Sequence, residues 1–153
     1  MKTALFVGRF QPFHKGHEYA IKSLFSKFDK LIVAVGSINR SDNENPYTFA
    51  QRKQMINAVL KNYRSKYKII GIPDTTSDQQ WVNNITKIAK FDIVVTRNAW
   101  TKKCFNGFSI LGQRMLKPRI YNATRIRRLM RSNKKWESYL PEAVVNILKS
   151  KGK

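Results

Sequence analysis

The sequence predicts an α/β fold: one doubly wound, Rossmann-like domain over residues 1–153, with a parallel sheet of about five strands and helices on both faces. Two observations carry this prediction. Short apolar runs alternate with stretches whose apolar residues recur at helical spacing, and the alternation continues without a linker, an internal repeat or a low-complexity segment. Units of this kind form right-handed crossovers, which require a mainly parallel sheet that helices cover on both faces.

The first half of the chain holds three predicted strands and two predicted helices. The strands are short apolar runs that end at glycine or proline: residues 4–7, 31–35 and 68–72. A helix is expected over residues 17–28, where the apolar residues share one face. Residues 37–46 are polar and rich in Asn and Ser, so they form a loop. Thr48 and Gln51 have capping-box spacing and begin the second helix.

The second half shows weaker patterns, but the alternation continues. The expected elements are a helix from about Asp78, a strand over 91–95, a short helix over 98–106, a strand around 119–121, a helix capped by Asn122 and a last helix from about Pro141. Gly107 is expected to stop the short helix, since glycine commonly ends helices. In a sheet of this class, ligands bind at the carboxyl ends of the strands.

A formal net charge of +21 is the unusual feature of the composition, with 30 Lys and Arg against 9 Asp and Glu. From Arg97 onward the only acids are Glu137 and Glu142. Such a surplus favours polyanionic partners, among them nucleotides, nucleic acid and anionic membranes, although it also describes a solvated basic surface. The charge alone does not choose among these.

Two further features indicate a cytoplasmic protein without a membrane partner. Cys104 is the only cysteine, which suits a reducing compartment. The apolar start of the chain ends at Gly8, too soon for the core of a secretion signal, and no later apolar run is long enough to span a bilayer.

The loop after the first strand reads GRFQPFHKGH and carries the strongest chemical signal. His14 and His17 are the only histidines of the chain and stand three residues apart. Gly8 and Gly16 let the backbone come close to a ligand. The helix that begins here turns its free amides and its positive dipole end toward the same place, and Arg9 adds a full positive charge. The combination is typical of a polyphosphate site.

Two other interpretations of the histidine pair are weaker. Histidines at this spacing bind metals in some proteins, but no nearby Cys, Asp or Glu completes a tetrahedral set. Histidines also pack as structural residues, but a loop rich in glycine and charge makes a poor core. The loop matches neither GxxxxGK[ST] nor GxGxxG, so it is neither a P-loop nor a dinucleotide-binding fingerprint.

The same string resembles the HxGH signature loop of the nucleotidyltransferase superfamily, in the form found in archaeal-type nicotinamide-nucleotide adenylyltransferases. Weaker matches follow in the family's order along nearly the whole chain: Gly36-Ser37, the segment ENPYT with Arg52, the pair Trp81-Val82, TRN at residues 96–98 and NATRIR at residues 122–127. In the last motif Thr124 and Arg127 match the family, whereas Asn122, Ala123 and Arg125 depart from it.

The resemblance implies adenylyl transfer: an acceptor phosphate attacks the α-phosphorus of ATP in line and expels pyrophosphate, without a covalent intermediate. It assigns His14 and His17 to the phosphates around the reacting group, and Arg127 to the leaving β- and γ-phosphates. The residues implied for ATP binding are Gly8, Arg9, Phe10, Gly16, Asn122 and Thr124. An ionised phosphate nucleophile needs no general base, which agrees with a loop that offers no carboxylate pair.

The acceptor that the resemblance implies is nicotinamide mononucleotide. The residues implied for its binding are Ser37, Asp74, Asp78, Trp81 and Asn98. Trp81 is expected to stack on the nicotinamide ring, although an apolar position on a helix also suits the core. A carboxylate at Asp78 accepts hydrogen bonds from a carboxamide and repels the carboxylate of nicotinic acid. We therefore expect the amide to be preferred over the acid.

Two alternatives stay open on the sequence alone. One is a transferase of the same superfamily with another acceptor: nicotinic acid mononucleotide, phosphopantetheine or FMN. Enzymes for the last two more often carry aspartate where this chain has Gln11. The other is a basic nucleic-acid-binding protein, with stacking from Trp100, Phe105, Phe108 and Tyr121. Magnesium is implied by ATP and is expected on phosphates and water. Members of the resembled family are often multimeric, so a homo-oligomer agrees with the sequence.

Overall fold

A five-stranded parallel sheet lies at the centre of the computed structural model, which describes residues 1–151. The strands are β1 (Thr3–Gly8), β2 (Lys30–Val35), β3 (Tyr67–Gly71), β4 (Ile93–Val95) and β5 (Ile110–Leu111). Their spatial order is β3-β2-β1-β4-β5, and every neighbouring pair is parallel. The chain runs from β1 to one edge and then returns to the other, so the order reverses beside β1. Ligand crevices of doubly wound sheets form at such a reversal.

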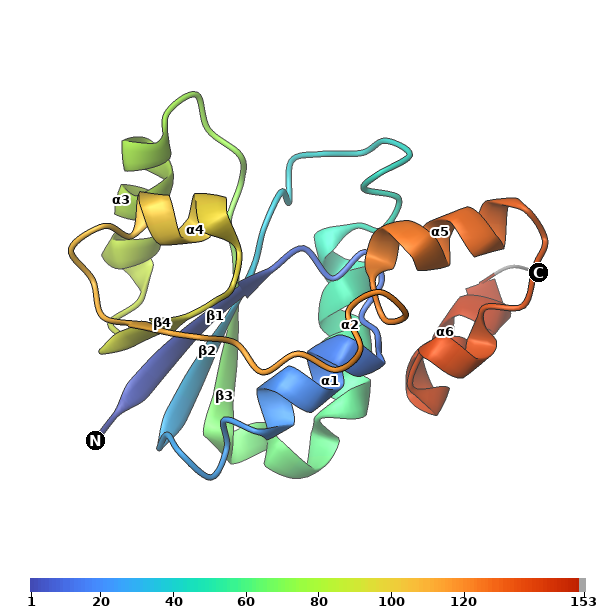
Figure 1. The fold of residues 1–153 in the computed structure, drawn as a ribbon, viewed down its shortest axis with the longest axis horizontal. Coiled ribbons are helices and arrows are strands. Elements are labelled where there is room, and N and C mark those ends of the chain that lie inside the picture. Colours follow the sequence, from blue (N-terminus) through green and yellow to red (C-terminus); the bar gives the residue numbers. More distant parts are fainter. Residues whose placement is uncertain (152–153) are drawn as a thin grey trace.

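Helices cover both faces of this sheet, as the sequence predicts (Figure 1). They are α1 (Lys15–Lys22), α2 (Phe49–Val59), α3 (Asp78–Ile88), α4 (Ala99–Cys104), α5 (Ala123–Arg131) and α6 (Glu142–Lys151), with 3-10 turns η1 (Lys61–Lys66) and η2 (Glu137–Tyr139). Helices α3 and α4 lie on one face, and α1, α2, α5 and α6 lie on the other (Figure 1). None of the helices in residues 1–151 is long and apolar enough to cross a bilayer.

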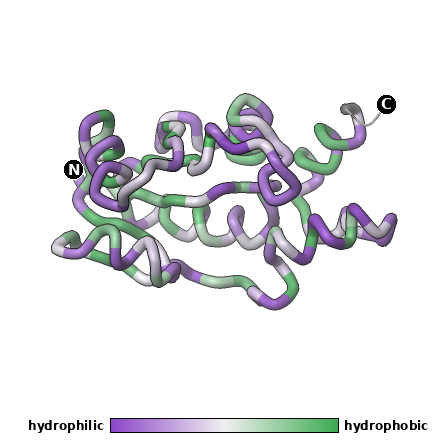
Figure 2. The backbone as a smooth tube through the Cα atoms, turned by 90° about the horizontal axis from the view of Figure 1, so that it is seen from above, coloured by the Kyte–Doolittle hydropathy of each residue, from purple (hydrophilic) through white to green (hydrophobic). Residues whose placement is uncertain are grey.

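Two hydrophobic clusters, one on each face, hold these layers together. Successive residues of a strand point to opposite faces, so Phe6 joins the cluster under α1 and α2 while Leu5 joins the cluster under α3. Both side chains are almost completely buried. The hydrophobic colour in Figure 2 follows the strands through the middle of the molecule, while much of the surrounding helical surface is hydrophilic. Burial on both faces explains why the strand sequences are continuous apolar runs.

The predicted starts of α2, α3, α4 and α5 are confirmed. The Thr48 hydroxyl accepts a hydrogen bond from the Gln51 amide at 3.1 Å, and the Gln51 side chain accepts one from the Thr48 amide at 2.8 Å. Asn98 and Asn122 cap α4 and α5 through their side-chain oxygens. Ser77, one residue before the expected start, caps α3. Each cap satisfies an amide that the first helical turn leaves unpaired.

The sequence predicts the fifth strand around residues 119–121, and this prediction is wrong. The strand that pairs with β4 is β5, through Val94 opposite Ile110 and Val95 opposite Leu111. Residues 119–121 form a turn, in which the Tyr121 amide donates to the Lys117 carbonyl at 3.0 Å. A strand of two residues is too short to give an alternating pattern, and only its pairing with β4 defines it.

The first helix also differs from its prediction. It begins at Lys15 and ends at Lys22, instead of running over 17–28. Hydrogen bonds between residues three apart replace the helical ladder after Lys22, which makes residues 23–27 a series of turns. The earlier start has a specific cause, because the cap is His14. Of the expected domain over residues 1–153, the last two residues lie outside the part that the structure describes.

Candidate active site

The histidines of the first loop cap the helix that follows them. His14 Nδ1 accepts hydrogen bonds from the amides of Gly16, at 3.0 Å, and His17, at 3.4 Å. His17 Nδ1 accepts in turn from the His14 amide at 3.1 Å. The two imidazoles therefore form a reciprocal capping box, with rings stacked at 3.7 Å between centroids. This arrangement requires a spacing of three residues, because it joins the cap to the third helical position.

The capping box also fixes where each imidazole carries its proton. A ring nitrogen that accepts from an amide holds no hydrogen, so each neutral ring carries its proton on Nε2. Burial lowers the pKa of His14 to about 4. Burial also lowers the pKa of His17 well below its usual value, and the neighbouring His14 lowers it further. At neutral pH the site holds two uncharged imidazoles, each with one fixed Nε2–H donor.

The lowered pKa values of the two histidines make the stability of the fold depend on pH. The folded-state pKa of His14 lies below the usual 6.5, so between pH 6.5 and 4 the unfolded chain binds a proton that the folded chain does not. Stability must fall as the pH falls through this window, by about 3 kcal/mol for His14 alone. We expect urea unfolding at pH 7, 6, 5 and 4 to show this loss. A His14→Asn variant, whose amide oxygen keeps the cap, should lose about 3 kcal/mol less, and equal slopes for both proteins would contradict the assignment.

Two glycines make room for aromatic rings of this loop. A Cβ on Gly16 would lie 2.8 Å from His14 Cε1, and one on Gly8 would lie 2.8 Å from the Phe10 ring. The sequence suggests that these glycines admit a ligand, but in the structure the rings fill the space beside them. Glycine is needed here so that the rings can fold back over their own backbone.

Backbone strain marks the carboxyl ends of β1 and β2. Phe10 has a φ of 53° and Ser37 a φ of 54°, in the left-handed region that residues other than glycine seldom adopt. Phe10 is buried against Phe13, and its ring meets His17 edge-on at a centroid distance of 4.7 Å. Strained backbone of this kind persists where surrounding packing holds it, commonly at functional sites.

The amino end of α5 faces the same loop through Arg127. Its guanidinium is buried and donates through Nη1 to the Gln11 carbonyl at 2.7 Å. Nη2 forms an ion pair with Glu44, and it also lies 3.4 Å from the Thr124 hydroxyl. Arg127 Nε is buried without a hydrogen-bond partner. Arg127 thus connects α5 to two loops, which are the loop after β1 and the loop before α2.

A cavity of about 310 Å³ opens between the first loop and α5. Its lining includes seven of the nine residues assigned to catalysis and ATP binding: Arg9, Phe10, His14, His17, Asn122, Thr124 and Arg127. Gly8 and Gly16 contact two of these lining residues, since the Phe10 ring packs on Gly8 and the His14 ring on Gly16. None of the described lining residues is acidic. Two arginines, two imidazole donors and the amino end of α5 converge on one space, which suits a polyanion.

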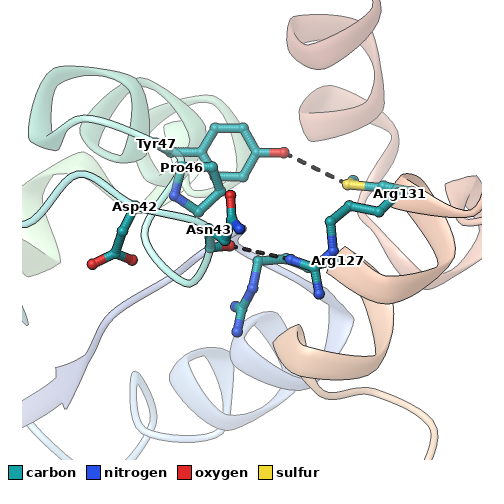
Figure 3. Close-up of a pocket in the computed structure, with 7 residues that line it drawn as sticks. Asp42, Asn43, Pro46, Tyr47, Arg127 and Arg131 are labelled. Atoms are coloured by element: carbon teal, nitrogen blue, oxygen red, sulfur yellow. Dashed lines mark hydrogen bonds between the residues drawn. The ribbon is translucent and has the colours of Figure 1, made fainter.

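A second, smaller cavity of about 230 Å³ lies on the other side of Arg127. Figure 3 shows Asp42, Tyr47, Arg127 and Arg131 around it, with Tyr47 hydrogen-bonded to the Met130 sulfur. Arg127 is the one described residue that lines both cavities.

The residues assigned to the acceptor divide into two groups. Asp74, Asp78 and Trp81 line a pocket of about 370 Å³ on the α3 side, together with Arg40, Thr75, Ser77 and Trp100. Ser37 reaches this group only through a hydrogen bond of 2.8 Å from its hydroxyl to Asp74. Asn98 is engaged as the cap of α4, where its side-chain oxygen accepts from the Thr101 amide at 2.9 Å.

Three residues at these sites did not figure among the assigned ones. Glu44 neutralises Arg127. Trp100 packs against Trp81 in the pocket on the α3 side. Arg52, completely buried, donates through Nη1 to the carbonyls of Arg9, at 2.8 Å, and Gly36, at 2.7 Å. Burial lowers the pKa of Arg52 to about 10, with a smaller effect from Arg9, so the guanidinium stays charged at neutral pH.

The side chains give a divalent metal little to bind. No group of three or more His, Cys, Asp or Glu side chains within residues 1–151 is placed to hold an ion. The stacked imidazoles cannot chelate through Nδ1, because amides already occupy both of these atoms. The cavity therefore fits a metal that phosphates and water hold, and it does not fit a metal caged by protein.

A histidine-capped helix after the first strand, together with the amino end of a second helix at the edge of a parallel sheet, is the arrangement expected of a nucleotidyltransferase. The chain belongs to the cytidylyltransferase-like family, whose model matches residues 5–149.

Relatives within this family are nicotinamide-nucleotide adenylyltransferases. The enzyme of Archaeoglobus fulgidus is 35% identical, over 95% of this chain and 90% of its own length. That of Pyrococcus abyssi is 34% identical, over 97% of this chain and 83% of its own length. Both alignments span nearly the whole described fold, which includes the first loop and α5.

Solved structures agree with this placement. A bifunctional NMN adenylyltransferase/ADP ribose pyrophosphatase from Francisella tularensis superposes with a TM-score of 0.78 at 28% identity, over 91% of this chain. This chain spans less than half of that protein, 44% of its length. A second structure of the Francisella protein, with a TM-score of 0.77, is a complex with AMP and a manganese ion.

Proposed function

We propose that this protein is a nicotinamide-nucleotide adenylyltransferase, which converts ATP and nicotinamide mononucleotide to NAD and pyrophosphate. The observation that carries the proposal is the reciprocal histidine cap, which presents two Nε2–H donors beside the amino end of α5. Family membership supports the same reaction, since the relatives are adenylyltransferases for this acceptor.

The reaction proceeds by in-line displacement at the α-phosphorus of ATP. An oxygen of the mononucleotide phosphate forms the new P–O bond, and the bond from the α-phosphorus to the bridging oxygen of pyrophosphate breaks. The attacking phosphate is already ionised, so no general base is required, and no covalent enzyme intermediate forms. Catalysis then consists of orienting two anions and stabilising the charge on the phosphoryl oxygens.

Four residues of the cavity have roles in this scheme. The Nε2–H groups of His14 and His17 donate to oxygens of the reacting phosphate. Because both imidazoles are neutral, they stabilise developing charge without forming a tight ion pair with the substrate. Arg127 faces the β- and γ-phosphates that leave, and Arg9 offsets the repulsion between the two substrates. Magnesium, held by phosphates and water, would neutralise part of the triphosphate charge when bound.

The direct test is incubation with ATP, magnesium and one acceptor at a time: nicotinamide mononucleotide, nicotinic acid mononucleotide, FMN or phosphopantetheine. Release of pyrophosphate together with NAD is expected with the first. Turnover of FMN or phosphopantetheine without NAD formation would overturn the choice of acceptor. A homo-oligomeric state, a cytoplasmic location and binding to nucleic acid stay predictions. Retention on nucleic acid that depends steeply on salt concentration would identify the last of these.

Asp78 is expected to favour the amide acceptor over the acid. Its carboxylate lines the acceptor pocket together with Asp74. The carboxylate of nicotinic acid mononucleotide would therefore meet negative charge there. For an Asp78→Asn variant we expect kcat/KM for nicotinic acid mononucleotide to rise about tenfold relative to the amide, or about 1.4 kcal/mol. Asp29→Asn, the same change at the amino end of β2, should leave the ratio of the two acceptors unchanged. An unchanged ratio in Asp78→Asn would remove Asp78 from acceptor selection.

A further inference from the structure

The acceptor pocket holds an aromatic side chain that the proposed reaction does not use. Trp100 is 46% exposed, yet its ring lies 4.7 Å from that of Trp81, at an interplanar angle of 54°. Trp81 itself is only 4% exposed, and both rings line the pocket. A half-exposed tryptophan therefore covers a buried one. In this conformation little of the Trp81 ring is accessible to a ligand.

A hydrogen bond holds Trp100 in the same place. Its indole Nε1 donates to Asp78 Oδ1 at 3.2 Å. Trp100 therefore has two polar or aromatic partners on α3, which are the ring of Trp81 and the carboxylate of Asp78. These are also the two α3 side chains that the family resemblance assigns to the acceptor's base.

The indole and a nicotinamide offer these partners the same chemistry. Each is a planar ring with an N–H donor at its edge, the ring nitrogen in the indole and the carboxamide in the base. Trp81 is only 4% exposed, so its ring has no free face for the base while Trp100 lies against it, and Asp78 Oδ1 already accepts from the indole. We propose that Trp100 occupies the place of the acceptor's base in the free enzyme, and that it must leave before the base can bind.

This inference rests on the proposed function, and it makes Trp100 a residue that sets acceptor affinity. In the closed form Trp100 lies against Trp81, and in the open form it has moved away. A ligand that binds only the open form has its apparent affinity reduced by the fraction of molecules that are open. One aromatic contact and one hydrogen bond to a charged group, both partly exposed, correspond to about a tenfold preference for the closed form. The cost falls on every acceptor alike, so Trp100 changes the affinity for the acceptor, while Asp78 discriminates between the amide and the acid.

The test compares Trp100→Ala with wild type in NAD synthesis. We expect the KM for nicotinamide mononucleotide to fall about tenfold, with the KM for ATP as the internal reference. Trp100→Phe keeps a ring but loses the N–H, so its KM should fall by a smaller factor. Phe108→Ala is the matched control, because Phe108 is also an exposed aromatic residue but packs on Phe91 and Phe105 outside the pocket.

A second readout follows the indole directly. Addition of nicotinamide mononucleotide to wild type should increase quenching of tryptophan fluorescence by acrylamide, and this increase should be absent from Trp100→Phe. A higher KM in Trp100→Ala would overturn the proposal, because it would make Trp100 a wall of the occupied site, and an unchanged KM would overturn it too. Failure of the proposed function is distinguishable, since wild type would then form no NAD at all.

Discussion

Replacement of His17 with alanine is expected to lower kcat by about 100- to 1,000-fold, the usual loss when one preorganised donor to a reacting oxyanion is removed. The donor is the Nε2–H that the capping box fixes in place. Because the donor acts on charge that develops in the transition state, the KM for ATP should change much less than kcat. Steady-state rates of NAD formation at saturating substrates provide the measurement.

Alanine also removes a structural contact, so a matched variant is needed. His17→Asn places an amide oxygen where Nδ1 accepts from the His14 amide, and thus keeps the cap while losing Nε2–H. We expect its thermal midpoint to return toward that of wild type while kcat stays low. Retention of more than a tenth of wild-type kcat by His17→Asn would show that this imidazole does not contact the reacting phosphate.

The sequence predicts most of the fold because the local patterns of apolar residues and helix caps agree with the final structure. The apolar runs of β1, β2 and β4 are mostly buried, and the caps at Thr48 and Asn122 are each made by the predicted side chain. It fails for β5, whose two residues are defined by pairing with β4 across the sheet. It also misplaces the start of α1, because histidine is an uncommon cap and His14 serves as one only together with His17.

The site was predicted less completely than the fold, for a related reason. The loop motif identifies both histidines and, by resemblance, Arg127, but the tautomers and lowered pKa values depend on burial that only the folded chain creates. Arg52 did leave a signal. It stands three and four residues before Met55 and Ile56, which places it on the buried face of α2. Trp100 gives no such signal in the sequence, because its contact with Trp81 joins two helices that are separate along the chain.

Arg52 explains how the strained ends of two strands are held. Its guanidinium lies under the carboxyl ends of β1 and β2, where Phe10 and Ser37 have positive φ. It also donates through Nε to the Thr48 carbonyl at 3.2 Å, which ties these strand ends to the start of α2. No acid pairs with it among the hydrogen bonds and ion pairs of the described residues. A charge buried in this way is retained for the backbone carbonyls that it organises.

Replacement of Arg52 with methionine is therefore expected to destabilise the fold by about 4 kcal/mol. Hydrogen bonds from a charged donor each contribute roughly 1.5–3 kcal/mol, and three are lost, while the desolvation of the guanidinium is relieved in part. The Gly36 carbonyl is left buried without its donor. For a chain of this size, the thermal midpoint should fall by about 8–16 °C. Unfolding in urea at pH 7 measures the difference.

Arg52→Met should also lower catalytic activity, apart from its effect on stability, because Arg52 holds the carbonyl of Arg9 in the loop after β1. We expect Arg52→Met to lower kcat/KM for ATP even at temperatures where the variant is fully folded. Arg52→Lys, which keeps the charge but has a single donor nitrogen, should recover part of the stability and little of the activity. Gln54→Ala, an exposed change on the same helix, is the control and should affect neither. If Arg52→Met unfolded at the same urea concentration as Gln54→Ala, the buried guanidinium would not be what fixes the two strand ends.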